Sequence, residues 1–362
     1  MNMPASAEPR SIRFATGPRL GRLAAAGLAF CAGLFTLACE TMAQPKLTVV
    51  ISSTSFAWLP LYVADGAGYF RDESLNVEIS NVKDGAVVVT AILSGNADIA
   101  GVGANAVFAA RVRNQPVRLL TPMNSEYTST IFGRKDVFGK KGITENSTLE
   151  QKIEAIKGMK VGVINFNSGQ HLMFRFLMQR YGGADLDKVA EVVPVGDAGS
   201  TLAAMSRGLV DITAFSPPVP QRAVTEGYAS VLLDPIRGDI PETRGMVFTA
   251  MATTEDTIAK RRTDLGAFVR AIDRANKLIY SDTPKAGEAA RKYLATMQSD
   301  LYDSGLKALV PATPKSPEVS IAGLKAYYEL LKIGGEKYAQ GEFDFEASVA
   351  NDLVREAMKG AR

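Results

Sequence analysis

The sequence predicts an α/β protein made of two successive strand–helix units and a helical C-terminal region. Two observations predict this class. Between residues 46 and 247, short apolar runs alternate with stretches in which apolar residues recur at helical spacing. Beyond residue 251 the strand pattern stops and the helical spacing continues. Strands that alternate with helices are joined by crossovers, so each unit is expected to be a mostly parallel sheet flanked by helices.

The first unit begins at residue 46 with a short apolar run. Its expected strands are residues 47–52, 76–80, 97–100 and 117–122. Its first expected helix begins at Leu59, and two further helices are expected at residues 86–93 and 104–113. The order of these elements is that of a repeated βαβ motif.

The second unit begins after a loop at residues 124–130, and a polar helix at 146–157 connects the two units. Its expected strands are residues 160–164, 191–195, 210–214 and 230–233, and its expected helices are 168–181, 201–207 and 217–226. The remaining helices are expected at residues 254–280, 284–297, 300–309, 317–333 and 345–359. A helical tail after two α/β units suggests that the chain crosses back to support the first unit.

Residues 1–43 have the pattern of a signal peptide and are left out of the fold prediction. Four arginines precede an apolar run from Leu23 to Cys39, and Thr41-Met42-Ala43 provides small residues for a signal peptidase. The run is too short and too rich in Ala and Gly for a good membrane span, which needs about 20 strongly apolar residues. We therefore expect cleavage after Ala43, export across the inner membrane and a periplasmic location.

Lipidation of Cys39 is the weaker alternative. The three residues before it, Thr36-Leu37-Ala38, lack the aliphatic residue expected three positions upstream of a lipoprotein cysteine. An uncleaved anchor is weaker still, because the apolar run is short.

Composition narrows the chemistry of the mature chain. Both cysteines, Cys31 and Cys39, lie in the signal, and the single histidine is His171. The expected mature chain therefore has no disulfide, thiolate nucleophile or cysteine metal site. Of the 41 basic and 38 acidic residues, four Arg and two Glu leave with the signal, so the net charge becomes +1. This balance argues against a nucleic-acid surface or a polybasic membrane patch.

Two local features resemble known sites only weakly. The sequence Gly101-Val102-Gly103-Ala104-Asn105-Ala106 follows a short strand, but it is third in the strand series and no acidic residue closes the next strand. We interpret it as a strand-to-helix turn whose free amides face a ligand, with a nucleotide site as the alternative. His171 has no second histidine or cysteine beside it, and the favoured interpretation is a partly exposed residue in the first turn of a helix. No catalytic or metal-binding motif and no cofactor site is predicted.

The loops that follow the strands share one chemistry. Several carry Ser, Thr or Asn where a helix N-cap is expected, and in open α/β sheets such loops meet where ligands bind. Capping residues are needed with or without a ligand, so aromatic residues decide the interpretation. Exposed aromatics that recur at one edge of a sheet line pockets. Those in these loops are Phe56, Trp58, Tyr127, Phe166 and Phe215.

Several segments resemble the substrate-binding proteins of nitrate/sulfonate/taurine-type ABC importers, which group with thiamine-precursor binding proteins and pyrimidine-synthesising enzymes. The segments are Pro60-Leu61-Tyr62-Val63-Ala64, Gly68-Tyr69-Phe70, Leu75-Asn76-Val77-Glu78, Leu93-Ser94-Gly95-Asn96-Ala97-Asp98-Ile99-Ala100, Gly158-Met159-Lys160-Val161-Gly162-Val163 and Ala203-Ala204-Met205-Ser206-Arg207-Gly208-Leu209-Val210-Asp211.

The resemblance implies a type II periplasmic-binding-protein fold with two lobes. One lobe would hold residues 46–128 plus 248–362 and the other residues 129–247, with the ligand between them. The family's ligand-facing loops fall on Ser53, Phe56, Trp58, Gly103, Asn105, Asn167, Ser168 and Phe215, and we add Tyr127 from the aromatic loops. The cysteine-rich motif of the pyrimidine-synthesising enzymes is absent.

The function implied is that of a monomeric, non-enzymatic solute-binding component that delivers a small ligand to an inner-membrane ABC permease. We expect the ligand to be a small organic anion or an aromatic or heterocyclic acid. No arginine lies in an obvious cleft loop, so a simple sulfonate or nitrate ligand is less favoured. The alternatives are a periplasmic enzyme that uses carboxylates in the same cleft and a ligand-sensing subunit.

Overall fold

The computed structural model describes residues 44–82 and 85–360. Gln44–Arg362 form one compact unit. The predicted signal peptide, its cleavage after Ala43 and the lipidation of Cys39 all lie outside the described residues, so they stay predictions.

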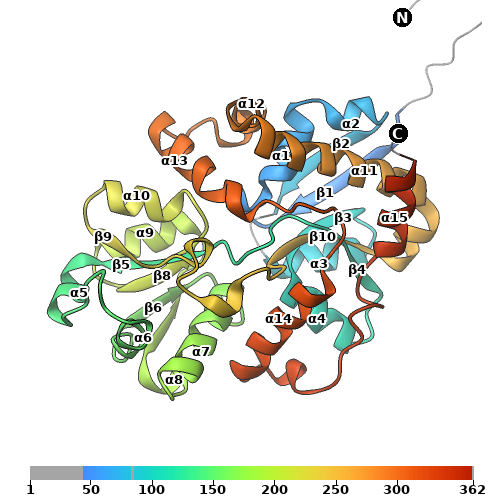
Figure 1. The fold of residues 1–362 in the computed structure, drawn as a ribbon. Helices are drawn as coiled ribbons and strands as arrows, with labels where there is room; N and C mark the ends of the chain where they lie inside the picture. The colour runs from blue at the N-terminus through green and yellow to red at the C-terminus, as the bar shows by residue number, and fades with distance from the viewer. Residues whose placement is uncertain (1–43, 83–84, 361–362) are drawn as a thin grey trace, which may run out of the picture. The chain divides into compact units, whose positions relative to one another are not determined.

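Two five-stranded sheets form the framework (Figure 1). The first has the order β2-β1-β3-β10-β4 and the second the order β7-β6-β8-β5-β9. The strands of the first sheet are β1 (Lys46–Ile51), β2 (Asn76–Asn81), β3 (Ile99–Gly103), β4 (Val117–Pro122) and β10 (Thr249–Thr254). Those of the second are β5 (Thr130–Arg134), β6 (Lys160–Val163), β7 (Glu191–Pro194), β8 (Ile212–Phe215) and β9 (Ala229–Leu233).

Each sheet contains a single reversed strand. In the first sheet β1 pairs in parallel with β2 and β3, while β10 is antiparallel to both β3 and β4. In the second sheet β6 pairs in parallel with β7 and β8, while β5 is antiparallel to both β8 and β9. The other strands of each sheet share one direction, which confirms the predicted α/β class with mostly parallel sheets.

The reversed strands are also the points where the chain changes sheet. β5 is the first strand after the chain leaves the first sheet, and β10 is the first strand after it returns. Two segments therefore connect the sheets, residues 123–129 and 234–248. We call them the first and second crossover.

Fifteen α-helices flank the sheets in the described residues. Those between the strands are α1 (Leu59–Gly66), α2 (Tyr69–Asp72), α3 (Gly85–Leu93), α4 (Ala104–Val112), α5 (Lys135–Lys140), α6 (Leu149–Glu154), α7 (Gly169–Tyr181), α8 (Leu186–Val189), α9 (Ala198–Ser206) and α10 (Val219–Thr225). Those after β10 are α11 (Glu255–Ser281), α12 (Thr283–Ala290), α13 (Ser299–Leu309), α14 (Ile321–Ile333) and α15 (Asn351–Lys359), which confirms the predicted helical C-terminal region.

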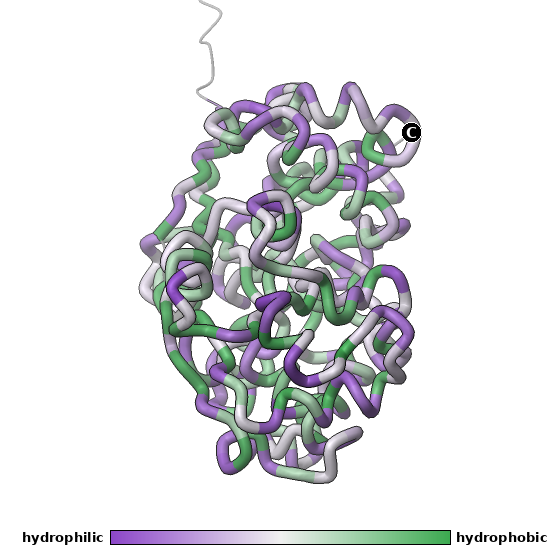
Figure 2. Tube along the Cα trace, turned by 90° about the vertical axis from the view of Figure 1, so that its left-hand side faces the viewer, coloured by the Kyte–Doolittle hydropathy of each residue, from purple (hydrophilic) through white to green (hydrophobic). Residues whose placement is uncertain are grey.

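Strand alternation divides the core of the first sheet into two layers. Leu47, Val49 and Ile51 of β1 belong to the cluster that includes α1 and α11, whereas Val50 belongs to the cluster that includes α3, α4 and α14. Successive side chains of a strand point to opposite faces, so a near-continuous apolar strand is covered by helices on both sides. Hydrophobic and hydrophilic residues alternate along the helices, as expected when one helix face is buried (Figure 2).

The hydrophobic cluster that contains Val50 extends from the first sheet to the second. It contains Val107 of α4 and Leu324 of α14 as well as Val161 of β6 and Leu172 of α7. The helical tail therefore packs on the first sheet through α11 and α15 and on the second unit through α14 (Figure 1).

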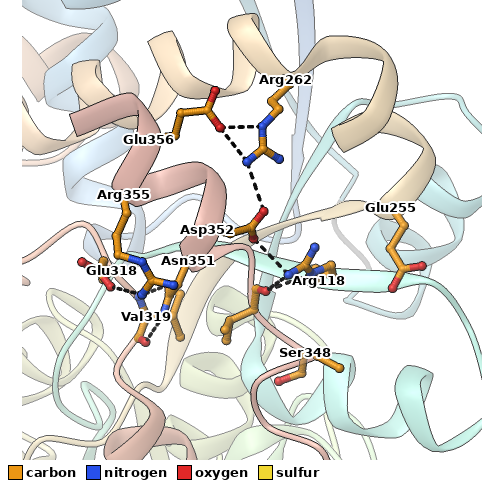
Figure 3. A network of polar contacts seen from close by, with 12 residues as sticks. Arg118, Glu255, Arg262, Glu318, Val319, Ser348, Asn351, Asp352, Arg355 and Glu356 are labelled. Carbon is orange, nitrogen blue, oxygen red and sulfur yellow. Dashed lines mark hydrogen bonds and ion pairs between the residues drawn. The ribbon is translucent and has the colours of Figure 1, made fainter. Parts of the chain in front are cut away.

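The C-terminal segment covers the edge of the first sheet at β4. The Leu119 amide donates to the Ser348 carbonyl and the Ala350 amide donates to the Leu119 carbonyl, both at 2.8 Å. Arg118 donates to the Val349 carbonyl and, at 3.1 Å, to Asp352 (Figure 3). Pairing an exposed edge strand in this way blocks edge-to-edge association.

The structure corrects three of the expected strands. The strand predicted at 97–100 is β3, Ile99–Gly103, because Gly101, Val102 and Gly103 pair with β10. The strand β5 was not predicted, because Thr130–Arg134 is short and contains a glycine. The strand β10, Thr249–Thr254, was not predicted either, because the strand pattern was expected to stop beyond residue 251. All three differences involve pairing with a strand that is distant in the sequence.

Candidate functional site

The residues predicted to bind a ligand lie at or after the ends of five strands, β1, β3, β4, β6 and β8. Ser53, Phe56 and Trp58 come after β1, and Gly103 and Asn105 lie where β3 enters α4. Asn167 and Ser168 lie between β6 and α7, Phe215 ends β8, and Tyr127 belongs to the first crossover. Their role in binding stays a prediction. Their surroundings, however, are defined.

The loop after β1 folds onto the core of the first sheet. The Trp58 indole Nε1 donates to Ser53 Oγ at 3.4 Å, and the Trp58 side chain lies against Gly101 of β3. The Phe56 ring packs edge-on against Tyr302 of α13, with ring centroids 5.1 Å apart. The expectation that Phe56 and Trp58 are exposed is wrong, because both rings fill the space between the sheet and its helices.

The turn between β3 and α4 is closed against the second crossover. The Ala104 amide donates to the Phe248 carbonyl at 3.0 Å, so the expectation that this amide is free is wrong. The Asn105 side chain folds back over Gly103, where an added Cβ would lie 2.5 Å from Asn105 Oδ1. Gly103 and Asn105 are both half-buried, and the Asn105 amide group is the polar group at the start of α4.

The loop between β6 and α7 is held by a buried histidine. His171 Nδ1 accepts a hydrogen bond from the Asn167 amide at 3.1 Å, so the ring proton lies on Nε2 and is donated to Asp187 Oδ1 at 3.0 Å. Ser168 caps α7, with its Oγ accepting from the His171 amide. The expectation of a partly exposed His171 is wrong, since the residue is 3% exposed. Its two ring nitrogens are engaged in fixing this loop.

Gln170 fixes the same loop from the other side. Its Oε1 accepts from the Ile164 amide at 3.3 Å and its Nε2 donates to the Ala214 carbonyl of β8 at 2.7 Å. Asn167 itself has a φ of 64°, a conformation that costs energy for a residue other than glycine. The surrounding hydrogen bonds hold it there.

Tyr127 and Phe215 are buried, which also corrects the expectation that these aromatics are exposed. Tyr127 packs on Phe248 with ring centroids 4.3 Å apart, and its hydroxyl donates to the Gly169 carbonyl at 3.4 Å. Burial raises the pKa of Tyr127 far above its ordinary value, and a hydrogen bond with Ser129 offsets only part of this effect. The hydroxyl therefore stays protonated and neutral. The two crossovers thus meet the start of α7 at an aromatic contact.

A buried polar network joins the first crossover and the start of β10 to loops of both sheets. Asn124 is at its centre: its Nδ2 donates to the Ala57 carbonyl at 3.1 Å, and its Oδ1 accepts from Thr249 at 2.7 Å. Thr128 Oγ1 and Ser216 Oγ are 2.8 Å apart, and Thr128 also donates to Asn124 at 3.4 Å. The network therefore ties the loop after β1 to the end of β8.

Sequence reasoning identified the loops that contain Asn124, Thr128 and Ser216 but missed Thr249 and Phe248. Phe248 ends the second crossover and Thr249 begins β10, which reaches this place only because it inserts between β3 and β4. In the sequence these two residues are an aromatic residue followed by a polar one. Without knowledge of the sheet topology, such a pair does not indicate a site.

A second set of contacts connects helices from opposite units. Arg175 of α7 donates to Glu336 after α14 at 2.6 Å, and the Glu336 side chain is only 9% exposed. Gly169 lies against Phe248, since an added Cβ would be 3.0 Å from its ring. At Gly305 of α13, an added Cβ would be 3.0 Å from Pro218 beside α10.

Residues 44–82 and 85–360 contain no group of three or more His, Cys, Asp or Glu side chains suited to hold a metal ion. Over the same residues, no helix has the length and apolar character needed to cross a membrane. The described site offers hydroxyls, amides, backbone groups and aromatic rings.

Comparison with known proteins identifies the family. A family model described as NMT1/THI5 like matches residues 55–286. The chain belongs to the NMT1/THI5-like family. The match ends within α12, and α13, α14 and α15 lie beyond it.

Two curated proteins match short parts of the chain. One is the putative binding protein YtlA of Bacillus subtilis, 39% identical over 64 residues, which are 18% of this chain and 19% of that protein. The other is the 4-amino-5-hydroxymethyl-2-methylpyrimidine phosphate synthase of Aspergillus parasiticus, 31% identical over 105 residues, 29% of this chain and 28% of that protein. The chain thus spans less than a third of the length of either relative.

A solved structure matches over nearly its full length. The periplasmic aliphatic sulphonate binding protein SsuA of Escherichia coli aligns with a TM-score of 0.65 at 14% identity, covering 86% of this chain and 99% of that protein. The likeness confirms the periplasmic-binding-protein fold predicted from the sequence.

Proposed function

We propose that this protein is the solute-binding component of an ABC importer, which captures a small organic anion or an aromatic or heterocyclic acid in the periplasm and delivers it to an inner-membrane permease. The observation that carries the proposal is the buried network around Asn124. It brings together the loop after β1, the residues at the end of β8, the first crossover and the start of β10, so strand ends from both sheets meet at one place. Ligands of α/β proteins bind outside such strand ends.

The same topology supports a division into two lobes that would close on the ligand. We assign residues 46–128 plus 248–362 to one lobe and residues 129–247 to the other. Because only the two crossovers join them covalently, rotation about residues 123–129 and 234–248 would separate the lobes without unfolding either sheet. The ligand would favour the closed state by contacting both lobes, and the protein would act as a monomer.

A periplasmic enzyme is the second candidate, since one short match is to a pyrimidine phosphate synthase. The arrangement of the site favours binding. The only histidine, His171, is buried with its two ring nitrogens hydrogen-bonded, and both cysteines of the chain lie in residues 1–43. The described site therefore offers neither a cysteine nucleophile nor a histidine with a free ring nitrogen as general base.

Thermal unfolding with a panel of ligands tests the proposal. The panel contains sulfonates, nitrate, aromatic carboxylates, pyrimidines and amino acids. A ligand present at a hundred times its Kd should stabilise the protein by about 2.7 kcal/mol, which raises the unfolding temperature by a few degrees. The absence of any shift across the panel would contradict solute binding.

The bound compound then separates the two candidates. Protein incubated with an excess of the stabilising compound should return it unchanged by mass spectrometry. Conversion of that compound beyond the molar amount of protein would identify an enzyme. A sensory subunit would bind without supporting uptake, so loss of uptake of the same compound on deletion of the gene distinguishes transport from sensing.

A further inference from the structure

We propose that Phe166, in the loop between β6 and α7, selects for ligands that carry an aromatic ring by stacking on that ring. This inference rests on the proposed function and names the residue that decides between its ligand classes. Phe166 differs from the other aromatic residues predicted in these loops, because it alone is exposed. Its exposed fraction is 56%, whereas the other four are at most 7% exposed: Phe56, Trp58, Tyr127 and Phe215.

The exposed ring occupies a defined position. It meets the His171 ring edge-on, with centroids 5.7 Å apart. The next residue, Asn167, donates its amide to His171 Nδ1, and His171 is fixed in turn by Asp187. Gln170 holds Ile164 on the other side of Phe166. Two buried polar side chains, those of His171 and Gln170, thus support a loop that carries an exposed aromatic ring.

This support suits a binding residue better than a surface residue. Ordered support reduces the entropy that a side chain loses when it engages a ligand. Among the large hydrophobic residues of the described structure, Phe166 has the highest exposed fraction. It follows the carboxyl end of β6, where the proposed cleft lies, and a ring at that place can stack on a planar ligand.

Ligand selectivity of a Phe166→Ala variant tests the proposal. The probes are benzoate and benzenesulfonate against propionate and ethanesulfonate, with Kd measured by calorimetry on the purified protein. The wild-type protein should prefer the aromatic member of each pair. Phe166→Ala should weaken aromatic binding by about 10- to 100-fold and leave aliphatic binding within about twofold, because burial of a ring against Phe166 is lost only for the aromatic probes.

Leu209→Ala is the matched control. Leu209 is 55% exposed in the same unit, but it precedes β8 and so lies toward the opposite, amino end of the parallel strands. It should leave all four affinities unchanged. Phe166→Leu is the second variant: it keeps an apolar side chain of similar size and should lose the aromatic preference as well. The unfolding temperature without ligand reports whether each variant is folded.

The outcomes separate the two proposals. Equal loss of both ligand classes, no loss of either, or a wild-type preference for the aliphatic probes would overturn the role of Phe166 while solute binding stands. If the wild-type protein binds neither these probes nor any compound of the wider panel, the proposed function itself fails and the role of Phe166 fails with it.

Discussion

Gly101 shows how one residue of the glycine-rich turn serves packing. An added Cβ there would lie 2.9 Å from Ile51 Cγ2 and 2.9 Å from the ring of Trp58. Both neighbours are buried, so neither can move into solvent. The glycine therefore allows β3 to pack closely against the loop after β1, where larger side chains would not fit.

Gly101→Ala should consequently destabilise the protein. Overpacking of a closed core costs about 1–3 kcal/mol, measured as the change in free energy of unfolding in urea. Trp58 is the only tryptophan of the chain, so its fluorescence reports unfolding at the site of the change. Gly139→Ala in α5 is the control, since nothing lies within 4 Å of its added Cβ, and it should be neutral or stabilising by about 0.5–1 kcal/mol. Equal effects of the two substitutions would show that packing at Gly101 is not tight.

Burial of Trp58 also changes how its predicted role in binding must be tested. Trp58→Ala would open a cavity in the core and cost about 3–5 kcal/mol of stability, which would obscure any effect on affinity. The fluorescence of the wild-type protein is the better probe. Asn124 binds the Ala57 carbonyl next to Trp58, so lobe closure about the first crossover should alter the emission when a stabilising ligand is added. An emission spectrum that stays constant at saturating ligand would contradict this coupling.

At the scale of elements, α15 depends on a charged network at its first turn. Asp352 pairs with Arg118 and with Arg262, both at 3.1 Å, and Arg262 also pairs with Glu356 (Figure 3). Burial alone would raise the pKa of Asp352, but the hydrogen bond from Arg262 and the charge of Arg118 outweigh it, so the pKa is lowered. A carboxylate in the first turn also interacts favourably with the helix dipole.

Asp352→Asn should therefore reduce stability at pH 7 by about 1 kcal/mol, a value near the upper end for an exposed ion pair. Because the folded-state pKa is lowered, this contribution is present above the unfolded value of about 3.9 and is lost as the pH falls through the lower folded value. The difference between variant and wild type in urea unfolding should then shrink between pH 5 and pH 3. Asp256→Asn is the control. Asp256 also lies in the first turn of its helix, α11, but it pairs with one lysine, Lys260, and both side chains are exposed. Its substitution should lower the free energy of unfolding by less than about 0.5 kcal/mol. A difference that persists unchanged at pH 3 would exclude the charge of Asp352 as the cause.

The elements also show what the sequence could predict. Apolar spacing identified β1, β2, β4 and the long helix α11 closely, because their patterns are local. It missed β5 and β10 and misplaced β3, and all three strands pair with partners from distant parts of the chain. The loops of the candidate site were found from their position after strands. The exposure of their aromatic side chains was not, because burial of Phe56 and Trp58 depends on α13 and β3, which close over them in the folded protein.

At the scale of the whole described unit, the pair Arg175–Glu336 joins α7 of the second unit to the segment after α14. Arg175 Nη1 and Glu336 Oε1 are 2.6 Å apart. The Arg175 side chain is 21% exposed and the Glu336 side chain is 9% exposed. The hydrophobic cluster that includes Leu172 and Leu324 lies beside this pair, since α7 packs on α14. In the proposed hinge motion, these contacts would hold the two lobes together on one side of the cleft.

Glu336→Gln keeps the shape of the side chain and removes its charge. Loss of one partner from a fully buried pair costs about 3–5 kcal/mol, and this pair is partly exposed, so we expect a loss of about 1–3 kcal/mol in free energy of unfolding. If the pair also stabilises the closed state, a stabilising ligand should bind more weakly to the variant, because part of its binding energy is spent on closure. Glu329→Gln in the preceding helix α14 is the control, since Glu329 makes an exposed contact with Lys332 and its loss should change stability by less than about 0.5 kcal/mol. A variant with lowered stability but unchanged Kd would assign Arg175–Glu336 to the fold alone, whereas changes in both would place it in the hinge equilibrium of the binding protein.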